Sequence, residues 1–405
     1  MKRDMFRRAL ALLLVAALLA AAGCSPAKEP QGSEPAESPA ESAQEPSGGE
    51  SGGAWTDALD GDAPELPEGE LELPEDNRRF DADFARRALA LCSGHTAENE
   101  RALLEEAGFE VLAQINFDKA DDDPAHTCAY TIGRKLIKYN NEERTLIIVA
   151  IRGTNAGEWY SNFDFAESHS DDAVFAENFL FAAEDVLLGV GEVLKTQRSP
   201  LVLVCGHSRG GACANLLALL LNAQLGADNV CAYTFASPNT VCGGDPGIDC
   251  SNIFNVINLG DLVPRVPLAG WGYCRPGIDI ILESDERSTA RAGEIYDVFY
   301  GVAPTISGYY NDRHSLTQAG LSEDGATVFE LMLLFVRTLA GASLDGAAGG
   351  GVELGAFSGE SDLAPLFNLL EDETKNGGEG AARLLKQHMP ATYQKLLAQY
   401  GERGE

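Results

Sequence analysis

Basic side chains are scarce in this sequence. Thirty lysines and arginines stand against 62 aspartates and glutamates, which gives a formal net charge of −32 at pH 7. Nucleic acids and anionic lipid headgroups attract proteins through positive charge, so this balance argues against both as electrostatic partners. Much of the negative charge lies in an N-terminal linker, where it belongs to a solvated tether. We therefore expect no nucleic-acid partner.

The sequence also lacks the spacings of a zinc site and an apolar run long enough to span a membrane comfortably. Its nine cysteines include no C-x-x-C pair, and no histidine–cysteine spacing is typical of zinc. The apolar run from Ala9 to Ala22 is too short to cross a bilayer comfortably. Metal-dependent chemistry and a transmembrane helix are thus not predicted.

Residues 1–23 instead resemble an export signal. Basic residues at positions 2, 3, 7 and 8 precede the apolar run. The stretch Ala21-Ala22-Gly23-Cys24 resembles a bacterial lipobox, although leucine is commoner than alanine at the first position. This predicts cleavage before Cys24 and lipidation of that cysteine; the alternative is an ordinary secretory signal. We expect a lipoprotein anchored to the bacterial cell membrane, facing outside the cytoplasm.

Composition divides the rest of the chain into three parts. Residues 24–75 consist mostly of Pro, Glu, Ser, Gly and Ala, and such a segment buries too little apolar surface to offset its ordering entropy. We predict a disordered acidic tether there. Residues 76–340 are predicted to form one folded domain. Residues 341–405 are predicted to be a glycine-rich linker and a helical tail, to which the sequence assigns no role.

Six of the remaining eight cysteines fall into two groups. Those in apolar segments are expected to be buried thiols: Cys205, Cys213 and Cys231. Those in loops rich in Gly, Asp and Pro are candidates for a disulfide such as Cys242–Cys250 if the protein is exported: Cys242, Cys250 and Cys274. The sequence leaves the pairing open.

The most informative stretch is residues 201–212. Four apolar residues, 201–204, predict a buried strand of a parallel sheet, and an apolar helical run follows to Leu225. Between them, Gly206-His207-Ser208-Arg209-Gly210 fits the G-x-S-x-G pattern. A serine on such a sharp strand-to-helix turn exposes its hydroxyl, so we predict Ser208 to be a nucleophile. The alternative is a glycine-rich turn with an incidental serine.

Strands and helices alternate along the predicted domain. Helical spacing recurs at 83–91, 97–107 and 174–196, and strand patterns recur at 127–137, 145–151, 230–235 and 252–259. This predicts an α/β-hydrolase fold with a mostly parallel sheet flanked by helices, and a helical C-terminal extension. Thr154, Ser208 and Asp261 each fall at or just past a strand's carboxyl end, where the active site of such a sheet lies.

A serine nucleophile needs a base, and in α/β-hydrolases the order along the chain is Ser, acid, His. Only His314 and His388 follow Ser208. His314 lies in a polar loop, and His388 lies in a helical region beside Met389-Pro390. The sequence favours His314 because catalytic histidines commonly occupy loops. His207 must point away from its neighbour Ser208 and is interpreted as structural.

The predicted acid is Asp261. It follows a strand in the segment 258–267, NLGDLVPRVP. The two prolines of this segment restrict the backbone after the strand to an extended conformation, which would hold the Asp261 side chain in place. Competing aspartates lack that context or lie too close to His314: Asp279, Asp297 and Asp312. The alternative interpretation of Asp261 is a turn-forming or helix-capping residue.

Attack on an ester creates an oxyanion that needs prepared donors, usually two backbone N–H groups. The predicted donors are the amide of Arg209, directly after the nucleophile, and Thr154, in the segment Arg152-Gly153-Thr154 that ends a strand. A plain strand-ending turn is the alternative for that segment.

Together these motifs resemble the class 3 (fungal-type) lipase family. They are Arg152-Gly153-Thr154, Trp159, Asn162-Phe163-Asp164, the pentapeptide 206–210 and the segment 260–267, GDLVPRVP. The resemblance covers residues 126–315. It implies an α/β-hydrolase fold, a Ser208–His314–Asp261 triad, an oxyanion hole using Thr154, and a short lid near residues 155–160.

The chain departs from that family at two places. Ala176-Glu177-Asn178-Phe179 replaces the common His-x-Gly-Phe, and Arg209 replaces the common leucine. Substrate and lid details therefore stay open. The aromatic residues after Thr154 are expected either to pack in the core or to line an acyl groove: Trp159, Tyr160 and Phe163.

The resemblance implies a serine esterase that hydrolyses the carboxylic esters of acylglycerols or phospholipids through an acyl-enzyme on Ser208. This chemistry needs no cofactor or metal. Two alternatives stay open. The same triad could serve thioester or peptide hydrolysis or acyl transfer, because fold alone does not fix the reaction. The scaffold could instead be a catalytically silent surface-binding lipoprotein. The sequence does not indicate the oligomeric state.

Overall fold

The computed structural model describes residues 64–94, 96–118, 127–153, 177–242, 247–265, 269, 273–313, 365, 368 and 386–403. Several predictions fall outside these ranges: the signal segment with Cys24, most of the tether, and residues Thr154, Trp159, Tyr160, Phe163 and His314. Within the described ranges, no helix is long and apolar enough to span a membrane.

A seven-stranded sheet forms the centre of the molecule, in the order β1-β2-β3-β4-β5-β7-β9. Its strands are β1 Glu110–Ile115, β2 Tyr130–Tyr139, β3 Glu142–Ile151, β4 Leu201–His207, β5 Val230–Phe235, β7 Ile253–Asn258 and β9 Ile278–Leu282. The strands from β3 to β9 run parallel, whereas β1–β2 and β2–β3 pair antiparallel. The predicted α/β fold with a mostly parallel sheet is confirmed.

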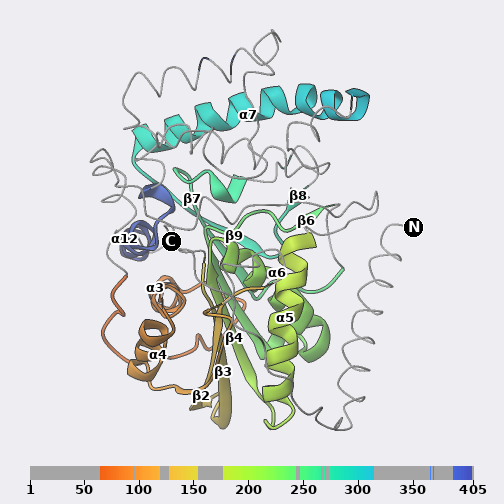
Figure 1. Ribbon diagram of the computed structural model, residues 1–405. Helices are drawn as coiled ribbons and strands as arrows, with labels where there is room; N and C mark the ends of the chain where they lie inside the picture. Colours follow the sequence, from red (N-terminus) through yellow and green to blue (C-terminus); the bar gives the residue numbers. More distant parts are fainter. Residues whose placement is uncertain are drawn as a thin grey trace, which may run out of the picture.

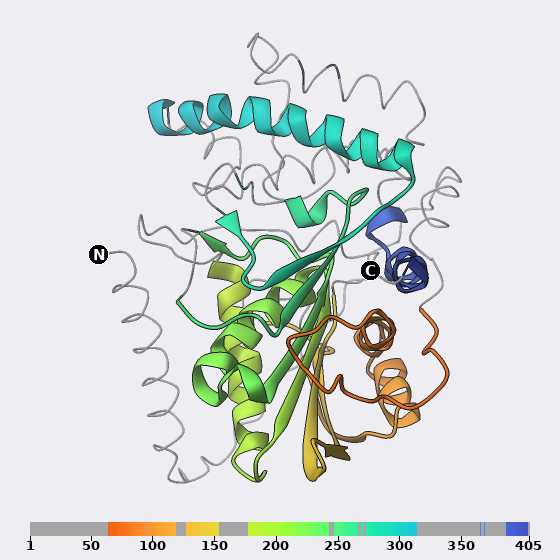
Figure 2. The same cartoon turned by 180° about the vertical axis from the view of Figure 1, so that it is seen from behind.

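Helices cover both faces of this sheet (Figures 1 and 2). Helices α5 Glu177–Leu194 and α6 Arg209–Leu225 cover one face. Helices α3 Ala82–Leu91 and α4 Ala97–Glu106 cover the other, where α12 Pro390–Arg403 packs beside α3. Helix α7 Glu286–Arg313 lies across the end at which the parallel strands finish.

The two faces of the sheet explain the apolar strands. Alternate residues of β3 point to opposite sides: Ile147 and Val149 belong to the cluster beneath α5 and α6, and Ile148 belongs to the cluster beneath α3. Every residue of β4 is buried. Continuous apolar runs are the signature of parallel strands covered on both faces, which is why this pattern identified the central strands.

Some elements match the sequence prediction and others do not. The strands expected at 127–137 and 145–151 are present as β2 and β3, which form a hairpin. Asn140 and Asn141 have φ values of 51° and 63° in its turn, a conformation that asparagine tolerates well. The edge strands β1 and β9 and the long α7 were not predicted. Edge strands are less buried and carry mixed side chains, so their hydrophobic pattern is weaker.

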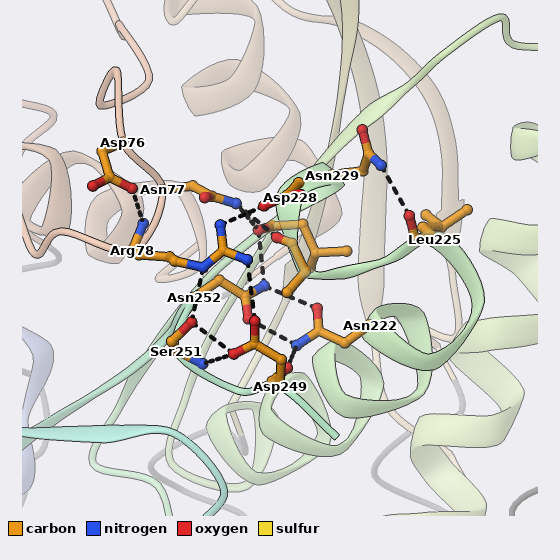
Figure 3. A network of polar contacts seen from close by, with 12 residues as sticks. Asp76, Asn77, Arg78, Asn222, Leu225, Asp228, Asn229, Asp249, Ser251 and Asn252 are labelled. Atoms are coloured by element: carbon orange, nitrogen blue, oxygen red, sulfur yellow. Dashed lines mark hydrogen bonds and ion pairs between the residues drawn. The ribbon is translucent and has the colours of Figure 1, made fainter. Parts of the chain in front are cut away.

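A polar network anchors the chain before α3 to the amino end of the central strands (Figure 3). The guanidinium of Arg78 binds Asp228, and its other nitrogens donate to Asp249 Oδ2 at 3.1 Å and Ser251 Oγ at 3.0 Å. Nearby, Asn77 donates to the backbone carbonyls of Ala227 and Val230. Because Leu71 is also buried, packed residues begin before the boundary predicted at residue 76.

The cysteines predicted to be buried thiols are buried and free: Cys205, Cys213 and Cys231. The side chain of Cys242 lies outside the description, so the pair Cys242–Cys250 stays a prediction.

Candidate active site

Ser208 occupies the sharp turn between β4 and α6. Its φ and ψ angles are 57° and −125°, a backbone conformation that residues other than glycine rarely adopt. The neighbouring glycines make the turn possible, because a Cβ on Gly206 would lie 2.2 Å from the carbonyl oxygen of Gly210. A Cβ on Gly210 would lie 2.5 Å from the carbonyl oxygen of Ile151. Close approach of strand and helix therefore fixes the residue types around the serine.

Asp261 follows β7 at the same edge of the sheet. The parallel pairing of β4, β5 and β7 brings the carboxyl ends of these strands together, so residues 208 and 261 become neighbours. The backbone N–H of Val263 donates to Asp261 Oδ1 at 3.0 Å, and the side chain is 1% exposed. This turn leaves Oδ2 to face the third group of the site.

That third group is His388. Its Nε2 lies 2.9 Å from Ser208 Oγ, and its Nδ1 lies 2.8 Å from Asp261 Oδ2. The histidine comes from the C-terminal segment, 180 residues after the serine, and is buried at 6% exposure. Serine, histidine and aspartate thus form one hydrogen-bonded chain in the geometry of a nucleophile, its base and the orienter of that base.

This arrangement corrects the choice of His314. The position between Ser208 and Asp261 is filled by His388, and His314 lies outside the described residues. The helical spacing around His388 had favoured a place within a helix. In the structure a helical turn ends at His388, Met389 forms a bend, and α12 begins at Pro390. Residues before proline avoid the helical conformation, and this was the overlooked signal.

The hydrogen bonds define which atoms carry protons. A carboxylate only accepts, so His388 Nδ1 donates to Asp261 and its Nε2 is left as the acceptor for the Ser208 hydroxyl. This is the tautomer that a general base needs, because the lone pair on Nε2 faces the Ser208 proton that is to be removed.

Tyr393 is a further member of the site that the sequence analysis missed. Its hydroxyl donates to Asp261 Oδ2 at 2.7 Å, and it also accepts from the backbone N–H of Asn258 at 3.2 Å. Burial, and then the negative charge of Asp261, raise the pKa of the Tyr393 phenol well above its usual value. The phenol therefore stays protonated and serves as a second donor to the carboxylate oxygen that faces His388.

Removing this donor should lower activity moderately. We expect Tyr393→Phe to reduce kcat by roughly tenfold, because a hydrogen bond to a charged group contributes about 1.5–3 kcal/mol and part of it is lost equally in the ground state. The matched control is Tyr400→Phe on the same helix, where the ring packs against Phe80. The pH profile of kcat should shift only in Tyr393→Phe. An unshifted profile and full activity would show that the hydroxyl is merely structural.

The C-terminal segment is held against the sheet on both sides of the histidine. Asn258 donates to the carbonyl of Gln387 at 2.8 Å, and Ser284 donates to the Gln387 side chain at 2.7 Å. His207 Nε2 donates to the carbonyl of His388 at 2.8 Å. His207 therefore points away from Ser208 and binds the segment that carries the base, which fits its interpretation as structural.

Arg209 is the first residue of α6, so its backbone N–H belongs to the first turn, where amides have no partner within the helix. Its side chain is buried and turns away to donate to the carbonyl of Thr127 at 2.7 Å. The second predicted oxyanion donor, Thr154, lies outside the described residues, as do Trp159, Tyr160 and Phe163. Among the described residues, no group of three or more His, Cys, Asp or Glu is placed to hold a metal ion.

The part of the chain that carries Ser208 and Asp261 matches a known protein family. Residues 148–271 match the family described as Lipase (class 3), which is less than a third of this chain. The match contains both Ser208 and Asp261, and it confirms the predicted resemblance over these residues. His388 lies outside the matched region.

Two curated relatives are similar over a longer stretch. The secreted mono- and diacylglycerol lipases A of Penicillium cyclopium and Penicillium camembertii are each 23% identical over 196 residues, 45% of this chain and 61% of theirs. The chain thus spans about three-fifths of the length of these relatives.

Solved structures of fungal lipases are also similar to the chain. The lipase of Rhizopus microsporus var. chinensis has a TM-score of 0.40 and 19% identity, covering 55% of this chain and 81% of its own. The native Rhizomucor miehei lipase propeptide complex has a TM-score of 0.37 and 17% identity, covering 49% and 66%.

Proposed function

We propose that this protein is a serine esterase of the class 3 lipase type, which hydrolyses carboxylic esters of lipids through an acyl-enzyme. The observation that carries the proposal is the hydrogen-bonded chain from Ser208 through His388 to Asp261, set on a strained strand-to-helix turn. The family match over residues 148–271 supports the same conclusion from sequence.

The geometry supports one sequence of proton movements. Ser208 Oγ attacks the ester carbonyl carbon while its proton passes to His388 Nε2, and Asp261 stabilises the imidazolium that forms. His388 then gives the proton to the departing alcohol, which leaves an acyl group on Ser208. A water molecule, deprotonated by the same Nε2, attacks the acyl carbonyl and restores the serine.

The backbone N–H of Arg209 is proposed as one donor to the oxyanion, because it lies at the start of α6 directly after Ser208. Thr154 is proposed as the second donor on the family resemblance. Trp159, Tyr160 and Phe163 are proposed to belong to the lid or acyl groove on the same basis. The positive end of the α6 dipole adds to the stabilisation of the developing charge.

Acylglycerols are the proposed substrate class. The similar Penicillium proteins are called mono- and diacylglycerol lipases, and fatty-acyl esters are the substrates that the resemblance implies. Phospholipids share the same ester bond and stay the second candidate. The triad by itself does not distinguish oxygen esters from thioesters.

We also propose the location and organisation that the sequence indicates. Cys24 would be lipidated after removal of residues 1–23, and residues 24–75 would tether the folded domain to the outer side of the cell membrane. The similar Penicillium lipases are named as secreted proteins, which agrees with export. A membrane-anchored enzyme of this kind would meet its lipid substrate close to an interface.

A fluorophosphonate probe tests the mechanism directly. The wild-type full-length chain should be labelled covalently, with the adduct on Ser208, because the probe reacts only with a serine activated by its base. Ser208→Ala, which removes only the hydroxyl, should not be labelled. A correctly folded wild-type protein that does not react would identify the silent surface lipoprotein instead.

Hydrolysis of p-nitrophenyl esters of increasing chain length then defines the substrate class. An optimum at long chains, raised by a lipid interface, would support a lipase; an optimum at short chains would support a small-ester esterase. Labelling of Ser208 without hydrolysis of any ester would favour thioester or peptide hydrolysis, or acyl transfer.

A further inference from the structure

Two cysteines meet beneath the active-site turn, and the proposed reaction uses neither. The Sγ atoms of Cys128 and Cys213 lie 3.0 Å apart, and both side chains are buried in the apolar cluster that α5 and α6 form with the sheet. Cys213 belongs to α6, five residues after Ser208, and Cys128 lies just before β2. Since 85 positions separate them in the chain, only the fold brings them together.

The surroundings of Cys128 favour the thiolate. Arg209 Nη1 approaches Cys128 Sγ at 3.5 Å while it donates to the carbonyl of Thr127. The hydrogen bond from Cys213 and the positive charges of Arg209 and Arg152 lower the pKa of Cys128 to about 7, against the opposing effect of burial. A thiolate is the reactive form of cysteine in disulfide exchange, so this sulfur would attack first.

We propose that Cys128 and Cys213 are a disulfide-forming pair that fastens the nucleophile helix α6 to the segment just before β2. The oxidant class is a small-molecule disulfide, such as oxidised glutathione. The Cys128 thiolate attacks one sulfur of that disulfide and releases a thiol. The Cys213 sulfur then displaces the second thiolate and closes the Cys128–Cys213 bond, and the Cys213 proton passes to the thiolate that leaves. The two cysteines together lose two protons and two electrons, and the oxidant is reduced to two thiols.

A second pair of cysteines serves as the internal comparison. Cys92 and Cys205 interact in the opposite layer, beneath α3, where burial raises the pKa of Cys92 well above its ordinary value. The Cys92 sulfur therefore stays a thiol. The two pairs are both buried, and they differ in the cationic side chain beside one of the sulfurs.

The bond would stabilise the fold. Joining residues 85 apart removes conformational freedom from the unfolded chain, and disulfides that close long loops have the larger effect. For a domain of this size the expected rise in melting temperature is about 5 to 15 °C.

The test compares the full-length protein equilibrated with oxidised glutathione and with reductant. After denaturation and alkylation, the oxidised sample should carry at least two fewer alkyl groups than the reduced sample. Peptide mapping should recover a fragment that joins Cys128 to Cys213. Complete alkylation of the oxidised sample, or a cross-link between other cysteines alone, would overturn the proposal.

Melting temperatures give an independent readout. Reductant should lower the melting temperature of the oxidised wild type by about 5 to 15 °C. Reductant should not change the melting temperature of the double variant C128A/C213A. This comparison is made within one variant, so a cavity left by the alanines does not affect it. The matched double variant C92A/C205A should keep the reductant-dependent shift. A shift that survives in C128A/C213A and vanishes in C92A/C205A would assign the bond to the other pair.

Discussion

His388→Ala should abolish ester hydrolysis, whereas His314→Ala should leave the rate close to wild type. His388 Nε2 lies 2.9 Å from Ser208 Oγ and is the base that the structure offers to the serine. Without it the serine hydroxyl keeps its proton, and kcat should fall by about 10⁴-fold or more. The measurement is kcat and KM on a p-nitrophenyl ester for both variants and the wild type.

The two histidine variants show which histidine serves as the base for Ser208. If His314→Ala is inactive and His388→Ala is active, the base comes from the residue chosen by sequence, and residues 386–403 do not carry the catalytic group. Thermal melting of both variants checks that an inactive protein is still folded. Fluorophosphonate labelling should follow the rates, since it requires the same proton transfer from Ser208.

Asp261→Asn should cost nearly as much as removal of the histidine, although it changes only one atom. The backbone N–H of Val263 donates to Oδ1, so the amide oxygen of the new asparagine should occupy that position. The amide NH₂ then faces His388 and requires Nδ1 to accept a hydrogen bond. This moves the histidine proton to Nε2, where it blocks transfer from Ser208. We expect kcat to fall on the order of 10⁴-fold with KM little changed.

The matched control for this substitution is Asp279→Asn. Asp279 was a competing candidate for the acid, and it forms an ion pair with Arg275 at 3.0 Å. The same loss of one negative charge at that position should leave kcat near wild type. A loss of less than tenfold in Asp261→Asn would show that the carboxylate does not set the histidine tautomer.

The turn at Ser208 could be predicted because its requirements are local. A buried strand, two glycines and an apolar helix follow one another within 25 residues, and the clash that a Cβ would cause at Gly206 involves Gly210 of the same turn. The position of Asp261 was predictable for a related reason. It comes directly after a strand, and parallel strands bring their carboxyl ends to one edge.

The histidine could not be chosen from local pattern alone. Both candidates satisfy the order serine, acid, histidine along the chain, and a loop setting favoured His314. The choice depends on α12, which packs against α3 and so carries His388 to the sheet edge. Tyr393 belongs to the same helix, and its role as a donor to Asp261 follows from that docking. No spacing in the sequence marks either contact.

Local sequence patterns were therefore enough to predict the α/β class, the serine turn and the strand ends on which Ser208 and Asp261 lie. The spacing of apolar residues and the G-x-S-x-G pattern each extend over a few neighbouring residues, so both can be recognised in the sequence alone. The tertiary structure decided which histidine meets the serine, which tyrosine meets the aspartate, and which cysteines meet beneath α6. These contacts join residues 85 to 180 positions apart, and the packing of whole helices on the sheet brings them together.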